Sequence, residues 1–77
     1  MKIKFKAVVS EVQDSKDYGQ SISLCDLDTG GMVRISMGDA RASVHNADIV
    51  NVDLDVKPAI IKGLMILRFQ SGTFVKA

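Results

Sequence analysis

The sequence is poor in the residues from which most catalytic and metal sites are built. It has one cysteine, one histidine and no tryptophan, and Glu11 is its single glutamate. One cysteine excludes an internal disulfide framework and a zinc site built from cysteines. Few groups are suited to proton transfer near neutral pH, so an enzyme is the least expected class. We therefore expect no catalytic residue, no cofactor, no metal site and no small-molecule substrate.

Long apolar runs and a surplus of one charge are absent too. The longest apolar runs span only a few residues, which is too short to cross a bilayer. The basic start, with Lys2, Lys4 and Lys6, is not followed by a continuous apolar segment, so we expect no signal peptide and a cytoplasmic location. Ten Lys and Arg against nine Asp and Glu give a net charge of +1. This balance excludes a histone-like polycation but permits a local basic stripe.

The chain does have enough apolar content for one small folded domain. It has 77 residues, of which 47% are hydrophobic. This length suffices for a single domain over residues 1–77 and is too short for two. Because a core of this size lies near the lower limit for independent stability, dimerisation would help by burying more apolar surface.

Apolar residues mostly alternate with polar ones, which is the period of β-strands. The alternation is clearest between Val50 and Val56, and similar patterns predict strands over residues 3–12, 21–25, 32–37 and 64–75. Cys25 lies within the second of these strands and is expected to pack in the core as a small hydrophobe. The pattern therefore predicts five strands.

Turn-forming residues separate the predicted strands. The run Asp28-Thr29-Gly30-Gly31 predicts a tight turn, and residues 14–19 a polar loop. Pro58 is expected to end the fourth strand because proline has no N–H for a ladder, which leaves residues 57–63 as a hairpin connection. The last strand is expected to bulge at Ser71-Gly72. Residues 38–48 have no clean period and predict a loop with a short helical turn that Asp39 could cap.

Five short strands favour a closed architecture. An open sheet of this length would expose an apolar face, whereas closure removes the edges and buries the alternating residues. The long first strand and the interruption after the third are typical of an all-β, OB-type Greek-key barrel. An SH3-like barrel is the competing architecture.

Several cations lie within or beside these strands. Arg34 is in the third strand and Arg68 in the last, while Lys16 and Tyr18 are in the first loop. A cation in a strand of a small barrel must point outward because an unpaired buried charge is costly. The outer face of strands two and three, with the adjacent loops, is the usual ligand surface of an OB barrel. Lys16 and Arg34 are therefore candidate phosphate contacts, and Tyr18 is a candidate stacking ring.

The basic residues of the first strand have two interpretations. Lys2, Lys4 and Lys6 share one face of the strand. They could contact a ligand, or they could protect an edge strand against aggregation. The sequence does not decide between these functions.

Three stretches resemble the single-stranded-DNA-binding proteins of filamentous phages, the gene V type. Lys16-Asp17-Tyr18, followed by Leu24-Cys25 and Asp26-Leu27, is similar to the DNA-binding wing and second strand of that family. Val33-Arg34-Ile35 is similar to the next strand, where the family carries a DNA-contacting lysine. Gly63-Leu64-Met65-Ile66 with Arg68, near the Val75-Lys76-Ala77 end, is similar to the C-terminal strand.

The resemblance implies an OB-type barrel, a two-fold homodimer, and cooperative, sequence-independent binding of single-stranded DNA in phage or plasmid replication. It marks Tyr18 as a stacking residue, Lys16 and Arg34 as backbone contacts, Arg68 as a phosphate contact, and Ile61 as the tip of the dimer hairpin. The chain also departs from the family. The segment from Cys25 to Arg34 is shorter, Asp26 stands where an aromatic is expected, and the first loop lacks arginines.

Two other functions stay open. A small β-barrel that binds another protein, such as a phage accessory protein without nucleic-acid binding, is favoured by the near-neutral charge and the few aromatics. An RNA-binding barrel is the third hypothesis, and RNA stays open as a partner. The cold-shock type of RNA-binding barrel needs a dense aromatic patch on strands two and three, and residues 21–36 contain no aromatic.

Overall fold

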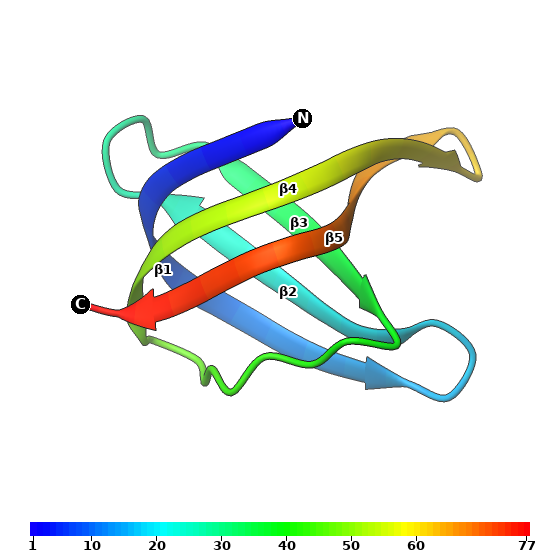
Figure 1. Cartoon of the computed structure of the whole chain (residues 1–77), viewed down its shortest axis with the longest axis horizontal. Coiled ribbons are helices and arrows are strands. Elements are labelled where there is room, and N and C mark those ends of the chain that lie inside the picture. The colour runs from blue at the N-terminus through cyan, green and yellow to red at the C-terminus, as the bar shows by residue number, and fades with distance from the viewer.

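The computed structural model describes residues 1–77 as five strands that close into a barrel (Figure 1). The strands are β1 (Lys2–Ser15), β2 (Gly19–Asp26), β3 (Met32–Gly38), β4 (Ile49–Ile61) and β5 (Leu64–Lys76). Their order around the barrel is β1-β2-β3-β5-β4, and β4 pairs back onto β1. The all-β, five-stranded barrel predicted from the sequence is therefore confirmed, with the OB-type strand order. No helix long and apolar enough to cross a membrane occurs in it.

The first strand is long because it takes part in both halves of the barrel. Residues 2–8 of β1 pair with β4, and residues 7–15 pair with β2. Ser10 is an extra residue between the paired Val9 and Glu11, which makes a β-bulge. A bulge bends a strand and increases its twist, so β1 can pass from one sheet to the other. The strand consequently continues to Ser15 and does not end at Val12 as predicted.

The barrel closes through a short parallel contact. Ile35 pairs with Leu67 and Ser36 with Arg68, whereas all other neighbouring strands are antiparallel. Closure removes an open edge that would otherwise expose unpaired N–H and C=O groups.

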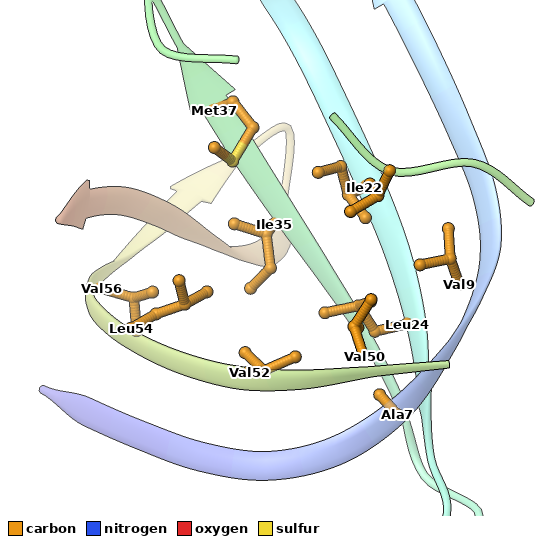
Figure 2. Packing of buried hydrophobic residues seen from close by; sticks show 11 residues of the cluster. Ala7, Val9, Ile22, Leu24, Ile35, Met37, Val50, Val52, Leu54 and Val56 are labelled. Atoms are coloured by element: carbon orange, nitrogen blue, oxygen red, sulfur yellow. The ribbon is translucent and has the colours of Figure 1, made fainter. Parts of the chain in front are cut away.

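The core consists of the inward residues of β1 to β4 and one residue of the connection between β3 and β4. Figure 2 shows their side chains converging in the interior, as the alternation predicted. Ile3, Phe5, Leu67, Phe69 and Phe74 are partly buried against this cluster. The buried set is Ala7, Val9, Ile22, Leu24, Ile35, Met37, Val44, Val50, Val52, Leu54 and Val56.

Cys25 does not belong to this core, so that prediction is wrong. Leu24 occupies the inward position of β2, and alternation turns the next residue outward. Cys25 is half-buried, with its Sγ 3.7 Å from the carbonyl oxygen of Gly30. Asp26 closes the same turn, because its Oδ1 accepts hydrogen bonds from the N–H groups of Asp28 and Thr29.

The connection between β3 and β4 is extended and contains no helix, contrary to the prediction, so Asp39 caps none. Ala40, Ala42 and Val44 face the core and alternate with exposed residues, which is a period of two. Gln20, only 4% exposed, holds this segment. Its Nε2 donates to the Ala42 carbonyl at 3.1 Å, and its Oε1 accepts from the Ala42 N–H at 2.7 Å. The Gln20 side chain thus satisfies the backbone groups of Ala42 as a neighbouring strand would.

The β4–β5 hairpin is longer than predicted because β4 runs through Pro58 to Ile61. The ladder of β4 with β1 ends at Asp55, and Val56 still makes backbone hydrogen bonds with Met1. From Lys57 onward β4 has an open edge, where proline is tolerated. Lys62 and Gly63 both have positive φ, at 52° and 79°, and form the two-residue turn typical of a tight hairpin. The hairpin therefore projects from the barrel as a two-stranded ribbon (Figure 1).

The predicted irregularity of the last strand lies one residue from its expected place. Gln70 is the extra residue, between Phe69, which pairs with Val56, and Ser71, which pairs with Asp55. Gly72 has a φ of 123°, and a Cβ there would lie 2.2 Å from the carbonyl oxygen of Asp53. The bulge and the glycine together let β5 follow the curvature of β4.

Replacing Gln20 with the similarly sized methionine should destabilise the protein. The change leaves the N–H and C=O of Ala42 without partners in a part-buried position, which costs about 1–3 kcal/mol. The free energy of unfolding in urea measures this loss. Gln70→Met, at an exposed position, is the matched control and should change stability by no more than about 0.5 kcal/mol. Equal stability of the two variants would contradict the role of Gln20.

Candidate nucleic-acid interface

An open groove of about 560 Å³ lies on the outer face of β2 and β3. The β1–β2 loop forms one rim and the β4–β5 hairpin the other, and both lie at the same end of the barrel in Figure 1. The fold brings Tyr18, Arg34 and Ile61 together in this groove from three distant parts of the sequence. Its other lining residues are Gln13, Asp14, Ser15, Gly19, Ser21, Ser36, Lys62, Leu64 and Ile66.

Arg34 lies in the floor of the groove and has neutral hydrogen-bond partners. Its Nε donates to Ser21 Oγ at 2.9 Å, and its Nη2 donates to Gln13 Oε1. The ion pairs of the molecule involve other groups. Because no carboxylate neutralises it, the guanidinium is held in place while its charge stays available to an anion.

Asp14 is the one carboxylate that lines the groove. It forms an ion pair with Arg41 of the β3–β4 connection, with Arg41 Nη2 2.7 Å from Asp14 Oδ1. Arg34 and Lys62 also line the groove. Since Arg41 offsets the charge of Asp14, the groove as a whole is positive.

Tyr18 stands at the rim on a short turn. Ser15 Oγ accepts hydrogen bonds from the N–H groups of Asp17 and Tyr18, at 3.2 and 3.3 Å. Tyr18 is 65% exposed, so most of this aromatic residue is accessible from solvent. Lys16 is exposed in the same turn and does not line the groove. Asp17, next to Lys16 in the turn, places a carboxylate near this cation.

Arg68 lies just outside the groove. It is exposed on β5, and in the parallel contact it pairs with Ser36, which lines the groove. Ile61 lines the groove wall together with Leu64, its partner across the hairpin. Four of the five residues singled out from the sequence thus lie in or beside the groove, and Lys16 lies in the loop at its rim.

The basic residues of β1 lie elsewhere. Lys2 and Lys4 stand directly opposite Asp55 and Asp53 in the ladder of β1 and β4. Lys6 stands opposite Asn51. Opposite charges across a ladder balance one another, so this half of β1 does not extend the positive groove.

Gln13 is one of the groove residues that sequence reasoning missed, as it also missed Ser21, Lys62, Leu64 and Ile66. The prediction ended the first strand at Val12, but the bulge at Ser10 changes the alternation so that Val12 turns inward and Gln13 outward. The change of alternation after Val9 is the signal that could have revealed it.

Comparisons of the chain with protein-family models, curated proteins and solved structures gave no match.

Gly19 fixes the β1–β2 loop against the end of β3, and alanine there should destabilise the protein. A Cβ on Gly19 would lie 2.0 Å from the backbone oxygen of Gly38. Gly30 is the matched control, because its φ of +74° is close to the +76° of Gly19 but nothing lies within 4 Å. Gly30→Ala should cost about 1–2 kcal/mol from backbone strain. Gly19→Ala should cost about 1–3 kcal/mol more, because the backbone must shift. Thermal or urea unfolding measures both, and equal losses would refute the clash.

Proposed function

We propose that this protein binds single-stranded DNA along the groove on the outer face of β2 and β3, without sequence preference, during phage or plasmid replication in the host cytoplasm. The observation that carries the proposal is the meeting of an exposed ring, Tyr18, and an uncompensated cation, Arg34, in one open groove. This face, with the same two flanking loops, is where OB-type barrels generally bind oligonucleotides.

The groove offers the two interactions that an unpaired polynucleotide needs. Arginine has five N–H donors, and the hydrogen bonds of Arg34 to Ser21 and Gln13 leave others free for a phosphate. Tyr18 offers a face on which any base can stack. The opposite wall is aliphatic, with Ile61, Leu64 and Ile66, and suits the faces of bases and sugars. Stacking on Tyr18 and phosphate contact with Arg34 do not read base edges, which supports binding without sequence preference.

The resemblance to the gene V type of protein supports the same surface. It marks Tyr18 and Arg34, which line the groove, and Arg68, which adjoins it through Ser36. Lys16 enters the proposal as a backbone contact from the loop at the rim. RNA offers the same phosphates and base faces, so the binding test compares both polymers.

Replacing Tyr18 with alanine should weaken binding to oligo-dT by about 5- to 150-fold, because stacking contributes about 1–3 kcal/mol per base. Tyr18→Phe keeps the ring and should keep most of the affinity. Fluorescence titration of labelled oligo-dT and oligo-U, at two salt concentrations, measures these effects, and affinity should fall as salt rises. No binding to oligo-dT in low salt would refute the function. If Tyr18→Ala binds oligo-dT with unchanged affinity, Tyr18 is not part of the binding site.

We propose further that the protein acts as a homodimer whose hairpins meet. Ile60 and Met65 pair across the hairpin and do not line the groove. They are 72% and 70% exposed, which is unusual for an adjacent pair of large apolar side chains. The resemblance places the dimer contact in this hairpin, and the small core makes added apolar burial valuable.

Ile60→Lys should shift the protein from dimer to monomer, because a charge would be buried in the contact. Sedimentation equilibrium measures the shift, and circular dichroism checks that the fold is kept. Ile49→Lys is the matched control, since Ile49 is also exposed but lies at the other end of β4. A monomeric wild-type protein at the highest soluble concentration would contradict the dimer.

A protein-interaction module is the alternative function. The exposed Ile60–Met65 pair and the net charge of +1 favour it. A folded protein that binds neither oligo-dT nor oligo-U in low salt would support this alternative.

A further inference from the structure

Two cations stand directly opposite each other on the β4–β5 ribbon. Lys57 of β4 pairs with Arg68 of β5, and both side chains are exposed. The pairs on either side turn inward, since Val56 is fully buried and Leu67 packs against the core. Lys57 and Arg68 therefore share the outer face, where directly opposed Cβ atoms are about 4.5–5.5 Å apart. Like charges in this position repel and destabilise the free protein.

No carboxylate compensates this pair. The ion pairs of the molecule include neither Lys57 nor Arg68. Asp55 shares the outer face of β4, but its Oδ1 accepts a hydrogen bond from the N-terminal amine at 3.1 Å. On its other side Arg68 has the uncharged Ser36 as its neighbour in β3. The two positive charges are therefore left without a partner inside the protein.

The pair continues the wall of the groove. Along the groove-facing side of the ribbon, Ile61 pairs with Leu64 at the tip and Ala59 pairs with Ile66. The next pair on this side is Lys57 with Arg68, because alternate residues of a strand share a face. Ser36, beside Arg68, also lines the groove. The cation pair thus adjoins two residues that line the groove, Ile66 of β5 and Ser36 of β3.

We propose that Lys57 and Arg68 together bind a phosphate of the nucleic-acid strand where it leaves the groove. The inference rests on the proposed single-strand binding and adds a second anion site to it. A phosphate between the two side chains replaces their repulsion with two charge-assisted contacts, one to a compact ammonium and one to a planar guanidinium. The site reads no base, so it lengthens the bound segment without adding sequence preference.

Lys57→Gln should remove one phosphate contact. In fluorescence titrations with oligo-dT, the slope of log K against log salt should become shallower by about 0.7, the value for one contact to a single strand. Lys57→Arg should keep the wild-type slope. Lys4→Gln is the matched control, because Lys4 stands opposite Asp53 away from the groove, and its slope should not change.

The same variant separates binding from folding. Because Lys57→Gln removes a repulsion, its unfolding midpoint without DNA should equal or exceed that of the wild type. A lower midpoint would show that Lys57 stabilises the fold, and would overturn the inference. An unchanged salt slope of Lys57→Gln would also overturn the inference if Tyr18→Ala still weakens binding. That combination would leave the proposed binding in the groove standing and remove only the second phosphate site. Absence of wild-type binding would instead overturn the proposed function, and the phosphate site with it.

Discussion

The structure depends on one strand that pairs with two different partners. The first half of β1 pairs with β4 and the second half with β2, and the bulge at Ser10 follows closely after Ala7 and Val8, which pair with both. Before the bulge, Ala7 and Val9 face the core, and after it Val12 does. The same shift turns Gln13 outward, where it binds Arg34. A single extra residue therefore bends β1 between its two partner strands and also turns Gln13 toward the cation in the groove floor.

Closure of the β-barrel explains how so short a chain can have an open polar groove on its surface. Eleven residues form the buried cluster, and β4 alone supplies four of them. Because the core is small, polar groups must secure the ends of the barrel, as the Gln20 amide does for the β3–β4 connection. The outward residues of β2 and β3 are then not needed for the core. They can be polar, as Ser21, Arg34 and Ser36 are, and they line the groove.

Local alternation predicted the five strands and nearly all of the core, because burial on a strand follows the sequence directly. The predictions of secondary structure were wrong where a residue distant in the sequence determines the local conformation. Pro58 can lie within a strand because β4 extends past Lys2, the first residue of β1, and the β3–β4 connection needs no helix because Gln20 pairs with it. Tyr18 and Arg34 could be chosen by residue type. The position of Ile61 in the same groove could not be predicted, because it depends on the length of the hairpin and on the short β3–β5 contact.

The net charge of +1 conceals an uneven distribution that only the strand register reveals. Lys2 and Lys4 stand opposite aspartates, whereas Lys57 stands opposite Arg68. Four cations that form no ion pair thus lie in or beside the groove, namely Arg34, Lys57, Lys62 and Arg68, although the molecule as a whole is nearly neutral. Lys6, opposite Asn51, is also without a carboxylate partner but lies elsewhere. For the proposed binding of single strands, one ring and a few cations would give one copy of the protein only a modest affinity, since each ring and each phosphate contact contributes little alone. In the proposed function, stable coating of a strand would therefore require neighbouring copies to bind together, and the proposed dimer contact through the exposed apolar pair of the hairpin would link them.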